Sequence, residues 1–250
     1  MEHYLNVDPA IPSFPGIDRA KVKKSTLEYY ASISSVDRNI GRLLDYLKES
    51  GLEKNTIVLF TSDHGYNEGR HGVNTKGNGH WMAGGVWGPK RPNMWDTSIS
   101  IPMAIRWPGV VKPGTRVDTM VSNLDMFRTV LGMTGVEMPD GARVYGMDFS
   151  PALRGEAFEK DRVLFGQYDL HNNGLAYMRM IRTSKYKYVR FFHAKNIDEL
   201  YDLEADPDEQ NNLFRRIMRE GDPEGVLGRL KGMLEENMRA IDDPLLTDSY

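Results

Sequence analysis

Apolar residues recur at helical spacing between Asp18 and Ser50, and a short, continuous apolar run follows them. The helical stripe consists of Val22, Leu27, Tyr30, Ile33, Val36, Ile40, Leu43, Leu44 and Leu47. Because residues three and four positions apart lie on one face of an α-helix, this spacing predicts a long amphipathic helix with Gly51 as its C-terminal cap. The run at residues 56–61, Thr-Ile-Val-Leu-Phe-Thr, is rich in β-formers and predicts a buried strand.

Two further elements are predicted before residue 160. A second apolar run at residues 103–107 predicts a strand, because a Pro-Gly pair follows it as a breaker and a turn. The segment Leu124 to Leu131 predicts a helix with Asn123 as its N-terminal cap. A buried parallel sheet needs neighbours for the strand at residues 56–61, and the first 160 residues offer few. We therefore expect further strands of this sheet in a segment that precedes residue 1.

Beyond about residue 161 the pattern changes to short strands that have no helices between them. These strands are expected at residues 163–168, 176–182 and 186–192, and a helix is expected near residues 226–240. Strands that cluster in this way indicate a small antiparallel sheet. The sequence therefore predicts two units: an α/β unit at residues 1–160 and an antiparallel α+β subdomain at residues 161–250.

The composition excludes several classes of function. The 250 residues are 40% hydrophobic and 27% charged, as is usual for a globular protein. A net charge of −3 offers no electrostatic case for binding nucleic acid, and no apolar stretch approaches the length of a membrane span. Since there is no Cys, disulfides and zinc-thiolate sites are excluded. Residues 1–20 lack the pattern of a signal peptide, and the compartment stays open.

Asp63 and His64 follow the strand at residues 56–61 almost directly. In open α/β sheets, ligands gather outside the carboxyl ends of the strands, so this pair lies where a site is expected. A carboxylate supplies charge and a hard oxygen, and a neutral imidazole supplies a nitrogen lone pair; together they suit a divalent cation. The alternative is an Asx turn that closes the strand, with His64 as an ordinary surface residue.

The segment from Gly65 to Pro102 has almost no apolar periodicity and is rich in glycine. Long loops inside compact domains are uncommon and are usually functional. Glycines let a backbone approach a ligand closely. We therefore expect this loop to form the wall of a polar pocket. Its polar and aromatic members include His71, Lys76, His80, Trp81, Trp87, Trp95 and Asp96.

Several motifs along the chain resemble, in type and order, those of the sulfatases of the alkaline phosphatase superfamily. They are Ser62-Asp63-His64-Gly65, Gly69-Arg70-His71-Gly72, Lys76-Gly77, residues 95–102 and Arg106-Trp107-Pro108-Gly109. Residues 29–41, 146–155 and 199–213 extend the resemblance over nearly the whole chain. It implies the distal half of an alkaline-phosphatase-like α/β sandwich with a mostly parallel sheet, incomplete here, followed by a small antiparallel α+β subdomain.

The resemblance assigns roles to Asp63, His64 and Lys76. Asp63 and His64 correspond to half of a four-residue site that is usually filled by calcium. Many members carry Asn in place of His64, so the identity of the divalent cation stays open. Lys76 follows Asp63 at the distance where sulfatases keep a lysine that contacts the sulfate. A fixed ammonium there would stabilise charge that develops on the ester oxygens; the alternative is a solvated loop lysine.

His71, His80 and Asp96 are further candidates. His71 or His80 could donate to the ester or hold sugar hydroxyls, and the alternative for each is a packing role in a glycine-rich loop. His80 is the better candidate because Trp81 follows it and could carry a sugar ring. Asp96 resembles the acidic position of the family before the Ile-Pro strand, where it is expected to orient the lysine or the backbone.

The resemblance also implies a nucleophile that this chain is not expected to supply. Sulfatases use a formylglycine made from Cys or Ser in a Cys/Ser-x-Pro/Ala-x-Arg motif, and we expect that motif in a segment preceding residue 1. The implied function is that of a metal-dependent sulfuric ester hydrolase that acts on a sulfated carbohydrate or an aryl sulfate. This chain alone is expected to be inactive. Two alternatives stay open: a phosphomonoesterase or phosphonate hydrolase of the same superfamily, and a non-catalytic module that binds sulfated glycans. Members are often periplasmic or secreted.

Overall fold

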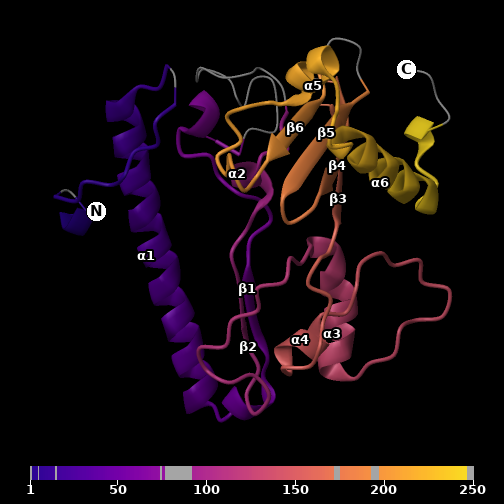
Figure 1. Ribbon diagram of the computed structural model, residues 1–250. Coiled ribbons are helices and arrows are strands. Elements are labelled where there is room, and N and C mark those ends of the chain that lie inside the picture. Colours follow the sequence, from indigo (N-terminus) through magenta and orange to yellow (C-terminus); the bar gives the residue numbers. More distant parts are fainter. Residues whose placement is uncertain are drawn as a thin grey trace.

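The computed structural model describes residues 2–4, 6–14, 16–73, 75–76, 92–171, 175–192 and 197–246. A long helix stands beside a pair of strands, and a four-stranded sheet with its own helices lies beyond one end of that pair (Figure 1). The described candidate site residues, Asp63, His64, His71, Lys76 and Asp96, belong to the segment between the two strands of the pair.

Helix α1 (Arg19–Glu49) forms where the long amphipathic helix is predicted. The side chain of Asp18 caps its first turn, and Gly51 has the positive φ of 73° that the C-terminal end requires. Much of the predicted apolar stripe faces solvent in this structure. Its half-exposed members include Ile33 at 48%, Val36 at 50% and Leu43 at 51% exposure.

Strands β1 (Val58–Thr61) and β2 (Met103–Arg106) occupy the two runs predicted as strands before residue 160. They pair antiparallel, with Val58 opposite Arg106. In the part of the chain that the structure describes, no parallel pair is formed, so the mostly parallel sheet stays a prediction. The short helix α2 (Asp96–Ile99) immediately precedes β2.

Helices α3 (Met126–Thr134) and α4 (Ser150–Leu153) cover the pair of strands. Met133, Phe149 and Leu153 are buried in one cluster with apolar side chains from both strands. This cluster is the core of the first half of the chain, and it supports the strand end from which Asp63 and His64 emerge.

The predicted helix cap at Asn123 is wrong. Ser122 is the cap, and with Asp125 it forms a capping box over the 3₁₀ turn Asn123–Asp125 that leads into α3. Ser122 has the extended backbone from which a hydroxyl can reach the N–H of Leu124. The cap therefore lies one residue earlier than the apolar pattern indicates.

The predicted small antiparallel sheet is confirmed, and it has four strands rather than three. In spatial order these are β3 (Leu164–His171), β4 (Leu175–Arg182), β5 (Tyr186–Phe191) and β6 (Glu199–Asp202). Each strand runs antiparallel to its neighbour. Strand β6 and helix α5 (Phe214–Glu220) are the elements of this half that the pattern did not predict.

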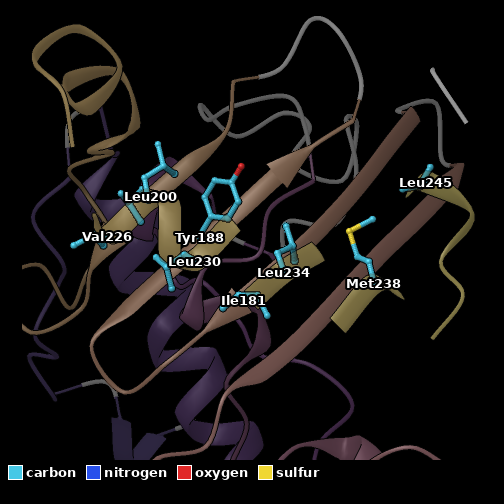
Figure 2. Packing of buried hydrophobic residues seen from close by; sticks show 9 residues of the cluster. Ile181, Tyr188, Leu200, Val226, Leu230, Leu234, Met238 and Leu245 are labelled. Carbon is cyan, nitrogen blue, oxygen red and sulfur yellow. The ribbon is translucent and has the colours of Figure 1, made fainter. Parts of the chain in front are cut away.

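Helix α6 (Val226–Ala240) coincides with the predicted C-terminal helix and packs on one face of the sheet. Leu230 and Leu234 of the helix meet Ile181 and Tyr188 of the strands in a fully buried cluster (Figure 2). The helix repeats its apolar positions at helical spacing, which explains why the sequence pattern locates it well. No helix among the described residues is long and apolar enough to cross a membrane.

Candidate functional site

Asp63 and His64 lie just beyond β1, in a tight turn held by its own hydrogen bonds. The backbone N–H of His64 donates to Asp63 Oδ1 at 3.0 Å, and Ser62 Oγ donates to the carbonyl of His64 at 3.0 Å. Hydrogen bonds from backbone N–H groups, that of Asp63 itself first, hold the pKa of Asp63 below its usual range. The side chain of Asp63 is 83% exposed, so it presents a carboxylate to solvent.

The ring of His64 is oriented by the next residue. Its Nδ1 lies 2.8 Å from the carbonyl oxygen of Gly65. Because a carbonyl oxygen can only accept, Nδ1 is assigned the proton, and in the neutral ring Nε2 then keeps the lone pair. Nε2 lies 3.6 Å from Asp63 Oδ2. A nitrogen lone pair and a carboxylate oxygen thus approach each other, as two ligands of one cation must.

These two donors fit part of a divalent-cation site. One charged oxygen suits a hard cation such as Ca²⁺, and the imidazole extends the range to softer metals. The residues that the structure describes gather no group of three or more His, Cys, Asp or Glu side chains for a metal. In this chain alone, water would therefore have to complete the coordination beside Asp63 and His64, and their role as ligands stays a prediction.

Gly65 brings the turn into direct contact with α2. Its N–H donates to the carbonyl of Ser98 at 2.8 Å. A Cβ at this position would lie 2.2 Å from the carbonyl oxygen of Thr97, a distance that real Cβ atoms essentially never show. Only glycine therefore allows the segment that carries Asp63 and His64 to pack this closely on the helix.

Lys76 is half-buried and follows a residue that is tied back to the start of the loop. The carbonyl of Thr75 accepts from the backbone N–H of Asn67 at 3.1 Å and from its side-chain Nδ2 at 2.7 Å. The backbone at Lys76 is thereby held beside Asn67, four residues after Asp63. The contact between Lys76 and a sulfate stays a prediction.

His71 packs between two aromatic side chains. Its ring stacks on Trp95 with centroids 3.7 Å apart and lies 5.0 Å from the ring of Phe14. Burial lowers the pKa of His71 to about 4, and its Nε2 is buried without a hydrogen-bond partner among the described residues. These contacts describe a neutral, packed ring, and a role in binding substrate stays a prediction. His80, Trp81 and Trp87 lie outside the described residues.

The neutral state of His71 gives a pH dependence with a defined sign. The folded pKa of about 4 lies below the usual histidine value of 6.5, so the unfolded chain takes up a proton first as the pH falls. The stability contributed by the neutral ring is complete above pH 6.5 and is lost towards pH 4. We expect the stability advantage of the wild type over His71→Asn to shrink by roughly 2 kcal/mol across this window.

Urea denaturation at several pH values measures this difference between the two proteins. Asn is chosen because it tolerates the positive φ of 54° at position 71, and taking the difference cancels the other titrating groups. His3→Asn, at an exposed histidine, is the control and should show no such trend. A constant difference between pH 4 and 6.5 would show that His71 titrates normally.

Asp96 is half-buried at the start of α2 and is paired with the larger sheet. Its carboxylate accepts from Arg182 at 2.7 Å and contacts Lys187, while its backbone N–H donates to Glu209. Burial alone would raise the pKa of Asp96, but Arg182 and Lys187 hold it below its usual value. The lysine that Asp96 orients in the described structure is therefore Lys187, a residue that the sequence pattern did not single out.

One serine has the spacing of the nucleophile motif, although that motif is expected only before residue 1. Ser150 heads the stretch Ser-Pro-Ala-Leu-Arg, but it is fully buried at the start of α4. Its Oγ donates to Asp148 Oδ2 at 3.0 Å and accepts from Arg154 at 3.1 Å. An enclosed hydroxyl with both partners within the same turn has a structural role here.

Two family models match the chain and together span most of it. The model described as Sulfatase matches residues 7–136, which include Asp63, His64 and Lys76. The model described as N-sulphoglucosamine sulphohydrolase, C-terminal, matches residues 85–238, which include the four-stranded sheet.

Individual relatives and solved structures are also similar to the chain. The chain is 32% identical to an N-acetylglucosamine-6-O-sulfatase of Bacteroides thetaiotaomicron, over 78% of this chain and 33% of that protein. A structure solved in complex with its substrate D-glucosamine-2-N,6-O-disulfate is similar with a TM-score of 0.74 and 27% identity, over 94% of this chain and 45% of that one. A phosphonate monoester hydrolase of Agrobacterium radiobacter is similar with a TM-score of 0.64 and 27% identity, over 87% of this chain and 41% of that one. The chain thus spans about a third of the first relative and less than half of each solved chain.

Proposed function

We propose, since the chain belongs to the sulfatase family of the alkaline phosphatase superfamily, that it contributes part of the site of a sulfuric ester hydrolase. In this proposal Asp63 and His64 are two ligands of a divalent cation, and Lys76 contacts the sulfate. The observation that carries the proposal is the hydrogen bond from His64 Nδ1 to the carbonyl of Gly65, which leaves Nε2 facing Asp63 Oδ2.

In this proposal a bound cation and several residues of this chain together stabilise the charge of the sulfate ester. Sulfatases generally use a divalent cation and a formylglycine, and calcium is the cation expected here. When bound, such a cation neutralises charge on the sulfate oxygens. Lys76 would add a fixed positive charge on the ester, and Asp63 would keep its carboxylate ionised at neutral pH. His71 and His80 are proposed to hold the ester or sugar hydroxyls.

A sulfated carbohydrate is the substrate class we favour. The support is that one similar protein carries the name N-acetylglucosamine-6-O-sulfatase and that one similar structure holds a glucosamine disulfate. The likeness to a phosphonate monoester hydrolase has the lower TM-score, 0.64 against 0.74, so the phosphonate alternative is not preferred. We also retain the proposed boundary near residue 160, because all strands of the antiparallel sheet follow it.

We expect the 250-residue protein to bind Ca²⁺ at Asp63 and His64 and to show no turnover of p-nitrophenyl sulfate. The reason is that it contains no Cys and that Ser150 is enclosed. Amide resonances of residues 62–65 report calcium binding, and release of p-nitrophenol reports turnover. His64→Ala should abolish the calcium response, whereas His3→Asn should leave it unchanged.

The possible outcomes separate the competing functions. Binding without turnover supports a chain that supplies part of a sulfatase site. Turnover that disappears in Ser150→Ala would identify a nucleophile within this chain and overturn our expectation. Neither binding nor turnover would favour a non-catalytic module.

A further inference from the structure

The side chain of Asn67 is fully buried between the site loop and α2, and every part of its amide is used. Its Nδ2 donates to the carbonyl of Thr75 at 2.7 Å and to Ser98 Oγ at 2.9 Å. Its Oδ1 accepts from Thr97 Oγ1 at 2.6 Å. The primary amide thus joins the backbone carbonyl of Thr75 to the side-chain hydroxyls of two adjacent residues of α2.

Hydrogen bonds attach both parts of the proposed site, the pair Asp63 and His64 and the lysine Lys76, to α2. Gly65, which follows the pair Asp63 and His64, is bound to the carbonyl of Ser98. Thr75, which precedes Lys76, is bound to Asn67 and through it to the hydroxyl of Ser98. The residues proposed as cation ligands and the lysine proposed to contact the sulfate are therefore both held by hydrogen bonds to the same turn of α2.

The turn of α2 is itself held by residues from the second half of the chain. The backbone N–H of Asp96 donates to Glu209, and its carboxylate is held by Arg182 and Lys187. Glu209 and Lys187 are almost completely buried and pair at 2.6 Å. Buried charge pairs of this kind hold one geometry because any displacement leaves a charge without its partner. Asn67 therefore attaches the loop to an anchor that belongs to the four-stranded sheet.

We propose that Asn67 is a positioning residue that sets Lys76 relative to Asp63 and His64, with α2 as the shared reference. The inference rests on the proposed function of Lys76, because it assigns Asn67 its role through that ammonium. Positioning matters here because catalytic effects of a fixed charge fall steeply when the charge is misplaced by about 1 Å. A lysine on a loop that is not tied down would have many rotamers to lose on meeting a sulfate.

Asn67→Asp tests the proposal with the least change in shape. The substitution keeps the acceptor for Thr97 but removes both donors and turns a carboxylate towards the carbonyl of Thr75. We expect amide hydrogen exchange at residue 67 to accelerate about tenfold, the size of one lost hydrogen bond. If circular dichroism shows that this variant does not fold, Asn67→Ser, which is shorter and uncharged, takes its place.

A paramagnetic probe measures the position of Lys76 directly. Mn²⁺ bound by Asp63 and His64 should broaden the amide resonances of those residues and, in the wild type, that of Lys76 as well. In Asn67→Asp we expect the broadening at Asp63 to persist and that at Lys76 to fall. A merely structural role of Asn67 would change the two positions together.

Two control variants separate the proposed contact from general effects. Thr97→Val removes only the hydroxyl that donates to Asn67, so the bond to Thr75 and the broadening at Lys76 should persist. Asn39→Asp changes an exposed asparagine whose amide donates to Ser35 on α1, and it should alter neither measurement.

The outcomes keep the inference distinct from the proposed function. No response of Asp63 and His64 to Mn²⁺ would remove the proposed metal site, and the exchange rate at residue 67 would then decide about Asn67 alone. Broadening at Asp63 without any at Lys76 in the wild type would overturn the positioning role. Unchanged exchange and broadening in Asn67→Asp would overturn it as well.

Discussion

Replacement of Lys187 by methionine is expected to lower the free energy of unfolding by about 3 to 5 kcal/mol. Lys187 is fully buried, and its Nζ lies 2.6 Å from Glu209 and 2.9 Å from the carbonyl of Met94. Methionine has a similar length but no charge, so Glu209 would stay in the interior without its cation, either as an unpaired carboxylate or as a carboxyl group that folding forces to take up a proton. The measurement is equilibrium urea unfolding of the two proteins at neutral pH.

Lys185→Met provides the matched control. Lys185 is on the same segment, but its side chain is 44% exposed and pairs with Glu204 at the surface, so its loss should cost less than about 1 kcal/mol. The double variant Lys187→Met/Glu209→Gln removes both charges and should recover a large part of the stability. Equal losses of unfolding free energy in the two lysine variants would show that the buried ion pair contributes no more to stability than the surface pair.

The pH dependence of the Lys187→Met effect has a predictable sign. Burial already raises the pKa of Glu209 to about 7, against the opposing charge of Lys187. Without that charge the carboxyl takes up a proton still more readily, and a neutral carboxyl is easier to bury. The stability loss should therefore be smaller at pH 5 than at pH 8.

The elements predicted well are those whose burial repeats at a regular spacing. Helices α1 and α6 and strands β3 to β5 were placed within a few residues, because their apolar positions recur with the period of the element. Strand β6 and helix α5 were missed because they are short and are stabilised by what they pack against. Glu199 and Asp202 begin and end β6, and such residues are rare in predicted strands.

The candidate site also has a part that the sequence predicts and a part that it does not. Asp63 and His64 stand out in the sequence because two polar residues follow an apolar strand, and that signal is local. The anchor of α2 joins Asp96 to Arg182, 86 positions away, and to Glu209, 113 positions away; no local pattern carries such information. One signal was available: Lys187 lies in a strand that is buried on both faces, where a charge needs a partner.

The sheet that holds β1 illustrates a different limit. The continuous apolar run at residues 56–61 predicts parallel neighbours because such a run is typical of a strand covered on both faces. Among the described residues, β1 has β2 on one side and pairs with it antiparallel. In the structure β1 is only partly buried, with Phe60 at 39% exposure, and an apolar run does not report the direction of the strand beside it.

The largest expected effect on catalysis is that of Lys76→Ala. In an active sulfatase that contains this chain, the substitution should remove about 3 to 4 kcal/mol of transition-state stabilisation, by comparison with the loss of one preorganised donor elsewhere. Charge on the leaving oxygen and on the sulfate grows as the ester bond breaks, so Lys76 should matter more in the transition state than in the bound substrate. We therefore expect kcat to fall by roughly two to three orders of magnitude and KM to change little.

Steady-state kinetics on a sulfate ester measure both constants. Lys112→Ala, at an exposed lysine outside the loop, is the control and should leave kcat and KM unchanged. Lys76→Arg keeps the charge but not the geometry of a compact ammonium, so it should recover only part of the rate. A higher KM with normal kcat in Lys76→Ala would assign Lys76 to uniform substrate binding, and unchanged constants would return it to the solvated loop residue that its sequence alone also allows. Because Asn67 is proposed to act through Lys76, the loss in Asn67→Asp/Lys76→Ala should not exceed that in Lys76→Ala alone.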